Sequence, residues 1–523
     1  MKIQLKIGLL AASPVWEHLL ELLGVSYAIP SPRELPDPTK YALLILNRQI
    51  GNSEQEAIAH YLREGGSVLA IGDTFATLTQ KPVQKKYLRA IIPSHTDQCT
   101  FPGLDVIDLF HTVYVCSDAP LLSHTVGFFP YSRGRIGFLG LDPVPLFTNV
   151  QALRKSFYAT SPRFPNEVVS RVSKGGVIQI LRESIKHLFF SRNLPFVHWW
   201  YFPEDAPGIF AFRLDSDDAS REQVNSFFQL INEFNIKSTW FLHGKAHEGW
   251  MDTFLPYQDQ GHEFGVHGYR HQVFKDVKRN VQNMEACKKL LLQAGLEVSG
   301  FAAPYGSWNS ALAKALEETK FLYSSEFSIG YDLYPFYPFV HQHKSSVLQI
   351  PIHPICIDSL RHAHASPQQM IDYFQHVIQR LIHSHIPLIL YDHPRHEYGQ
   401  VLKDIFSYVN SLGLLKMTLG EYAQWSSERL RVDFSASLTG DNIEIESRHL
   451  TSNRRLAIEN AERKISFIST PLKTSLNELK WQTHPREYPY APLPPQLRQI
   501  NPRLWWHNLF ARYFRWKKSR EER

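Results

Sequence analysis

An apolar run that breaks into a cluster of acids is the feature that most constrains the fold of this chain. Residues 208–214 read Gly-Ile-Phe-Ala-Phe-Arg-Leu, and residues 215–218 read Asp-Ser-Asp-Asp. Such a run is typical of a buried strand that carries carboxylates to one end of a sheet. Further along, His267 and His271 are four residues apart, which on a helical turn places them on one face. One carboxylate and two imidazoles can bind a metal and leave positions open for water and substrate.

The same residues also have an ordinary structural interpretation. Asp217 or Asp218 could cap a helix expected around residues 220–233, because acids after a strand are often N-caps. Two histidines at this spacing also arise by chance in a chain that contains 25 histidines. These two motifs alone therefore leave a metal site and a structural role equally open.

Two later segments favour the metal site over the purely structural role. Residues 301–306 read Phe-Ala-Ala-Pro-Tyr-Gly, and residues 388–394 read Leu-Ile-Leu-Tyr-Asp-His-Pro. The order of the four motifs resembles that of the polysaccharide deacetylases, also called carbohydrate esterase family 4 or the NodB-homology domain. The resemblance covers about residues 200–425.

The resemblance implies a role for each motif residue. In that family one acid acts as the base and the next as a metal ligand, which suggests Asp215 as the base and Asp217 as the ligand. The competing register, with Asp217 as the base and Asp218 as the ligand, remains open. His267 and His271 match the two histidine ligands. The implied cofactor is a divalent metal, and we expect zinc.

Two further positions match the family, and one departs from it. His393 matches the histidine that acts as general acid toward the departing amine. Tyr305 matches the residue whose backbone donor helps to hold the oxyanion. The family usually has an arginine just before Pro-Tyr-Gly that tethers the catalytic acid, whereas this chain has Ala302 and Ala303. Arg213, beside the acid cluster on the predicted strand, could substitute for it.

The predicted fold is α/β. Repeated strand–helix units over residues 201–425 suit a distorted (β/α) barrel of deacetylase type with its site at the strand C-termini. Four cysteines without paired spacing argue against a disulfide framework and against a cysteine zinc site. The net charge of +6 is modest, and we expect no nucleic-acid partner.

Residues 1–150 predict a second α/β domain. Apolar strands are expected at residues 41–46 and 66–72, with a helix between them at residues 53–64, so the sheet is parallel. This region resembles the class I glutamine amidotransferase-like fold, which carries a nucleophilic cysteine at the turn after such a strand. Here that turn reads Gly-Asp-Thr, so we expect a non-catalytic domain.

The rest of the chain divides by composition. Residues 151–200 predict a helical linker that ends in an aromatic run, which we interpret as core at a domain junction. Residues 426–475 alternate apolar and polar side chains, which indicates a small β-module. Residues 476–523 form a proline-rich linker and a basic amphipathic tail. The tail, residues 503–523, suits either a membrane interface or a helix packed on its own protein.

The function we predict is removal of an acetyl group from an N-acetylated sugar or polysaccharide by a metal-dependent hydrolase. One alternative is a hydrolase of another non-peptide C–N bond, and a second is a catalytically inactive carbohydrate-binding protein, since the usual arginine is missing. The N-terminus lacks a convincing signal peptide, which predicts a cytoplasmic location. Peripheral membrane contact through residues 503–523 is part of the same expectation.

Overall fold

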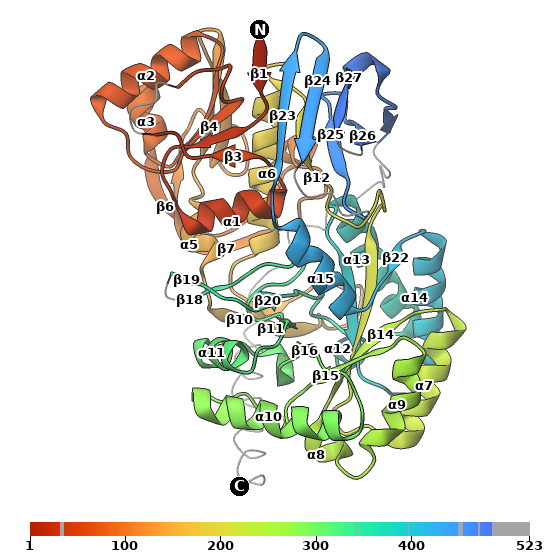
Figure 1. Ribbon diagram of the computed structural model, residues 1–523. Helices are drawn as coiled ribbons and strands as arrows, with labels where there is room; N and C mark the ends of the chain where they lie inside the picture. The colour runs from red at the N-terminus through yellow and green to blue at the C-terminus, as the bar shows by residue number, and fades with distance from the viewer. Residues whose placement is uncertain (32–35, 341, 396, 448–452, 469–470, 484–523) are drawn as a thin grey trace.

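The computed structural model describes residues 1–31, 36–340, 342–395, 397–447, 453–468 and 471–483. In Figure 1 the N-terminal region, in red and orange, and the C-terminal strands, in blue, lie together at one end of the molecule. The green and cyan elements of the predicted barrel lie at the other end. Among the described residues, no helix has both the length and the hydrophobicity needed to span a membrane.

A curled parallel sheet forms the barrel region. Its strand order is β20-β17-β16-β15-β14-β13-β21, and each neighbouring pair is parallel. The strands are β13 (Ile209–Asp215), β14 (Ser238–Leu242), β15 (Glu263–Val266), β16 (Gly300–Phe301), β17 (Tyr323–Ser324), β20 (Leu348–Gln349) and β21 (Leu388–Asp392). The barrel-type α/β fold is therefore confirmed, in the form of a half-barrel. The apolar run before the acid cluster is the fully buried β13, as its composition predicts.

Helices cover the outside of this sheet. They include α7 (Arg221–Glu233), α10 (Val277–Gln293), α11 (Ser310–Glu318), α13 (Pro367–His383) and α14 (Gly399–Ser411). Helix α15 (Leu419–Arg429) instead packs in the cluster that contains the opposite face of the sheet. Ser220 is the N-cap of α7, and its side chain accepts a hydrogen bond from the backbone N–H of Gln223. The expectation that Asp217 or Asp218 caps this helix is therefore wrong, because the cap is already supplied.

The N-terminal region contains the predicted parallel sheet. Its order is β3-β2-β4-β5-β9-β8, and only the β8–β9 hairpin is antiparallel among its described pairings. The strands are β2 (Ile7–Leu9), β3 (Tyr27–Ala28), β4 (Leu43–Leu46), β5 (Ser67–Ile71), β8 (Val126–Tyr131) and β9 (Gly134–Leu139). Helix α2 (Asn52–Arg63) connects β4 to β5, and the largely buried α6 (Lys174–Phe190) packs on the sheet.

Two of the C-terminal strands pair with strands from much earlier in the chain. One sheet has the order β1-β23-β24-β27, and another has the order β12-β25-β26-β28. The early strands are β1 (Lys2–Gln4) and β12 (Phe196–Trp199), and the late ones are β23 (Phe434–Thr439), β24 (Asn442–Ser447), β25 (Leu456–Glu459), β26 (Lys464–Ile468), β27 (Leu472–Ser475) and β28 (Gln482–Thr483). Residues 503–523, where the amphipathic tail is predicted, lie outside the described residues.

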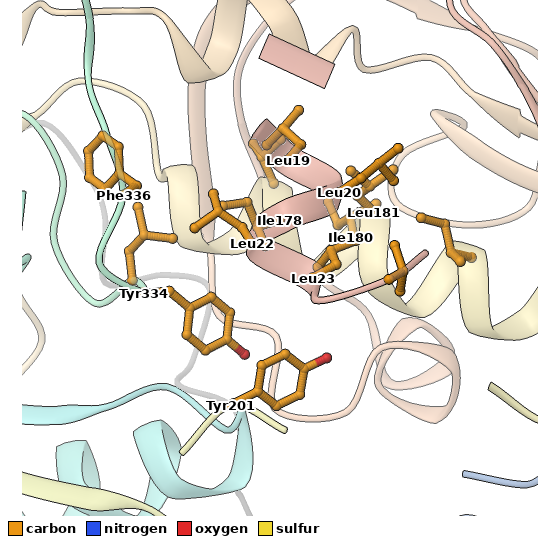
Figure 2. Close-up of a cluster of buried hydrophobic side chains, with 14 of the residues drawn as sticks. Leu19, Leu20, Leu22, Leu23, Ile178, Ile180, Leu181, Tyr201, Tyr334 and Phe336 are labelled. Atoms are coloured by element: carbon orange, nitrogen blue, oxygen red, sulfur yellow. The ribbon is translucent and has the colours of Figure 1, made fainter. Parts of the chain in front are cut away.

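A hydrophobic cluster joins the N-terminal region to the barrel. Helix α1 (Pro14–Leu23) and α6 contribute leucines and isoleucines, and Tyr201 and Tyr334 lie beside them (Figure 2). The rings of Tyr201 and Tyr334 stack with centroids 5.1 Å apart. Residues 199–202 are almost fully buried, so the aromatic run is core at a junction, as interpreted from the sequence.

Leu19→Ala is expected to destabilise this junction. Leu19 on α1 is fully buried, and truncating a buried leucine costs about 2–5 kcal/mol of unfolding free energy because a cavity remains. Thermal unfolding followed by calorimetry measures the effect. Leu292→Ala on α10 is the control, since Leu292 is 55% exposed and its loss is expected to cost less than about 0.5 kcal/mol. Equal shifts in the two variants would contradict the assigned core.

Candidate metal centre

Asp217, His267 and His271 converge at the C-terminal edge of the curled sheet. Asp217 Oδ1 lies 3.4 Å from His267 Nε2 and 3.0 Å from His271 Nε2. The two Nε2 atoms are 3.2 Å apart, and the three side chains form a group that could hold a metal ion. The sequence placed these histidines together for the wrong reason, because residues 267–271 form a loop after β15 rather than a helical turn.

Backbone geometry in this loop brings His271 back toward His267. Gly268 has a φ of 86°, a left-handed conformation that glycine adopts without a Cβ clash. The Asn283 side chain on α10 then accepts a hydrogen bond from Arg270 N at 2.7 Å and donates to Arg270 O at 3.1 Å. A helix outside the motif therefore fixes the position of the second histidine.

The three donor atoms suit a divalent cation. His267 Nδ1 lies 2.8 Å from the carbonyl oxygen of Ala302, and a carbonyl can only accept, so Nδ1 carries the proton. His267 Nε2 therefore presents a lone pair toward Asp217. Asp217 Oδ1 is buried and has no hydrogen-bond partner among the described residues. Although burial opposes ionisation, the neighbouring histidines hold the pKa of Asp217 well below its usual value. Such an anionic oxygen beside imidazole nitrogens is the donor set that a site of the zinc type uses.

Asp215 is held by an arginine. This carboxylate is buried at the end of β13 and accepts from Arg213 Nε at 2.7 Å and from Arg213 Nη2 at 2.6 Å. Burial opposes the charged form, but Arg213 lowers the pKa of Asp215 below its usual value. The guanidinium also donates to the carbonyl of Ser325. An arginine on β13 itself therefore pairs with the carboxylate that the sequence predicts as the base.

His393 approaches Asp217 from the other side. Its Nε2 lies 3.5 Å from Asp217 Oδ2, and it follows β21. Burial opposes protonation, but the Cys356 side chain and the carboxylates of Asp217 and Asp215 raise the pKa of His393 to about 10. Cys356, Asp392 and His393 also form a second group of close potential ligands. Sequence reasoning missed Cys356, because this buried cysteine belongs to no motif and comes from a loop before α12 (Ile357–His362).

Tyr305 lies at the rim of the centre. It belongs to the short 3₁₀ turn η2 (Pro304–Gly306). Its ring centroid is 4.8 Å from that of His271, and the residue is 45% exposed. The Pro-Tyr-Gly motif therefore reaches the group of metal-binding candidates.

Asp218 does not join the cluster. Its side chain is 75% exposed, and its Oδ1 lies 3.4 Å from His243 Nδ1. His243 follows β14, and its ring centroid is 5.5 Å from that of His271. His243 has no signal in the sequence, because one histidine after an apolar strand forms no periodic pattern.

A comparison with protein families assigns this region. Residues 213–324 match the family model described as polysaccharide deacetylase. The match contains Asp215, Asp217, His267, His271 and Tyr305, and it ends before His393. This part of the chain is therefore a polysaccharide deacetylase domain. A search of curated proteins finds no match, and the N-terminal region receives no family.

Three solved structures with a similar fold each cover less than half of this chain. A protein proposed as a polysaccharide deacetylase from Mycobacterium smegmatis has 18% identity, covering 48% of this chain and 96% of its own, with a TM-score of 0.38. A CE4 family pseudoenzyme from Bacillus anthracis has 16% identity, covering 42% and 68%, with a TM-score of 0.32. A family 4 carbohydrate esterase from Streptomyces lividans has 12% identity, covering 40% and 92%, with a TM-score of 0.29.

Proposed function

We propose that this chain is a metal-dependent deacetylase that removes the acetyl group from an N-acetylated sugar or polysaccharide. The observation that carries the proposal is the convergence of Asp217, His267 and His271 beside the buried Asp215. The polysaccharide deacetylase domain supplies the substrate class.

The metal would be held by the Asp217 carboxylate and by Nε2 of His267 and His271. We expect zinc, because one carboxylate and two imidazoles with open positions are typical of a catalytic zinc site. When bound, the metal supplies a Lewis acid that makes water more acidic and polarises the acetamide carbonyl.

The chain's own side chains would move the protons. Asp215 accepts a proton from the water that attacks the acetamide carbon, and Arg213 keeps its carboxylate ionised and oriented. A backbone N–H at Tyr305 donates to the oxygen that gains negative charge. His393 donates a proton to the amine nitrogen as the C–N bond breaks, and acetate and the free amine leave.

Two alternatives remain distinct from this proposal. A hydrolase of another non-peptide C–N bond would use the same groups on a different substrate. An inactive carbohydrate-binding protein is the second alternative, motivated by the missing arginine before Pro304. The Arg213–Asp215 ion pair supports the active form instead. Within the proposal, the N-terminal sheet is a non-catalytic amidotransferase-like domain. The cytoplasmic location, and the choice for residues 503–523 between membrane contact and packing on the protein itself, stay predictions from the sequence.

His267→Ala is expected to abolish both metal binding and deacetylation, because two remaining ligands cannot hold an open site tightly. Purified wild-type protein is expected to carry about one divalent metal per chain, measured by atomic emission. Acetate release from N-acetylated oligosaccharides measures activity. His362→Ala is the control, since His362 is an exposed histidine at the end of α12. Full metal content in His267→Ala would contradict the proposed metal site. A wild-type protein that binds the metal but releases no acetate would contradict the proposed substrate class.

A further inference from the structure

Asp217 has an unfavourable backbone conformation that neighbouring groups must maintain. Its φ is 44°, in the left-handed region that residues with a Cβ rarely adopt. Such a conformation persists only where the surrounding structure enforces it. In this conformation the Asp217 carboxylate lies 3.4 Å from His267 Nε2 and 3.0 Å from His271 Nε2. The two histidines follow β15, which is separated from β13 by β14.

Contacts from the end of β14 enforce this conformation. The backbone N–H of His243 donates to Ser216 Oγ at 3.0 Å, and Ser216 N donates to Phe241 O at 3.0 Å. His243 Nδ1 lies 3.1 Å from the carbonyl oxygen of Asp217. Because that carbonyl can only accept, Nδ1 is the donor. His247 Nε2, 2.7 Å from Ser216 Oγ, holds the serine from the other side.

We propose that His243 is a positioning residue that fixes Asp217 for metal binding by donating a hydrogen bond from Nδ1 to the Asp217 carbonyl. The inference rests on the proposed metal site. The ring is 7% exposed, so water competes little for this hydrogen bond. Without the donor, Asp217 is free to relax to a negative φ, and its carboxylate turns away from the two imidazoles.

The other ring nitrogen defines a competing role. His243 Nε2 is buried and has no hydrogen-bond partner among the described residues, and the ring lies close to His271. A direct contact of Nε2 with the metal would therefore be an alternative. Asp218 Oδ1, 3.4 Å from Nδ1, is a second acceptor, but it belongs to an exposed side chain.

Amide substitutions separate the two nitrogens. Asparagine places its amide near the position of Nδ1, whereas glutamine places its amide near the position of Nε2. The measurement is the Zn²⁺ dissociation constant of metal-free full-length protein, determined by competition with a chromophoric chelator. We expect His243→Asn to stay within about threefold of wild type. His243→Gln and His243→Ala should weaken Zn²⁺ binding by about 10- to 100-fold, the range typical when a partner that orients a ligand is lost.

Two controls isolate the Asp217 carbonyl. His262→Ala removes another buried histidine, which bonds Ser238 and Asn232 at the far end of β14, so it lowers stability and leaves Zn²⁺ affinity unchanged. Asp218→Asn should also leave Zn²⁺ affinity unchanged. The proposal would be overturned if His243→Gln kept the wild-type affinity for Zn²⁺ while His243→Asn lost it. Equal Zn²⁺ affinities in all three His243 variants would also overturn it.

Crystal structures of the metal-free variants test the same inference without any metal. Asp217 should keep its positive φ in His243→Asn and adopt a negative φ in His243→Ala. An unchanged φ in His243→Ala would overturn the positioning role even if the wild-type protein bound no Zn²⁺. Conversely, a changed φ in a protein without deacetylase activity would support the positioning role and contradict the proposed function.

Discussion

Asp217→Asn is expected to lose its metal, whereas Asp215→Asn is expected to keep the metal and lose catalysis. Replacing an anionic ligand by a neutral amide weakens a divalent site, so Zn²⁺ affinity in Asp217→Asn should fall by more than the roughly 10- to 100-fold typical of losing an orienting partner. Asp215 does not belong to the ligand group. Its amide cannot accept a proton, so the rate in Asp215→Asn should fall by about 10² to 10⁴.

Bound metal and single-turnover acetate release, measured on the same preparations, separate these outcomes. Excess metal should restore part of the activity of Asp217→Asn and none of that of Asp215→Asn. Asp218→Asn is the matched control, because Asp218 is exposed and lies outside the cluster. The competing register would be supported instead if Asp218→Asn lost metal while Asp217→Asn kept it without turnover.

Arg213→Met is expected to damage both stability and catalysis. The substitution leaves the Asp215 carboxylate buried without its guanidinium, and breaking a buried ion pair in this way costs about 3–5 kcal/mol. The pKa of Asp215, now depressed by Arg213, should rise. With a depressed folded-state pKa, the carboxylate stabilises the fold above its unfolded-state pKa and loses this contribution as the pH falls. Arg213→Met should therefore weaken the dependence of stability on acid pH.

A double-mutant cycle identifies the interaction. Arg213→Met combined with Asp215→Asn removes both charges, so its loss of unfolding free energy should be smaller than the sum of the two single losses. Arg213→Lys keeps the charge without the two-pronged guanidinium, and we expect it to retain part of the activity. Chemical denaturation and acetate release are the measurements. Wild-type activity in Arg213→Met would mean that the missing arginine before Pro304 has no functional replacement.

Local patterns explain what could be predicted from the sequence. The apolar run of β13 predicts a buried strand, and the acids that follow it lie at the sheet edge for that reason. The convergence of Asp217 with two histidines was predicted, although the helical turn assumed for the histidines is a loop. The His243 and Cys356 side chains come from other strands and loops, and neither has a local pattern that points to its neighbour. The proximity of these two side chains to the metal-binding candidates depends on the order of the strands in the sheet, which hydrophobic periodicity does not specify.

The sequence pattern also does not predict that the C-terminal strands pair with earlier ones. The alternating segments after residue 430 predict strands, and β23 and β25 are present. Their partners β1 and β12, however, lie far away in sequence. Alternation defines the faces of a strand and not its neighbour, so a separate β-module was the natural expectation for residues 426–475.

The pairing of β1 with β23 and of β12 with β25 also affects the order in which the sheets form during synthesis on the ribosome. β12 pairs with β25, and β1 pairs with β23, and the whole half-barrel lies between the partners in the sequence. The two sheets that contain β1 and β12 therefore remain incomplete until the C-terminal strands have been synthesised. Long-range contacts of this kind form late, because the intervening chain must first be ordered. β1 and β12 therefore expose unpaired edges until β23 and β25 have been synthesised. Such edges are prone to aggregate, so slow elongation past residue 430 should favour chaperone binding at these two strands.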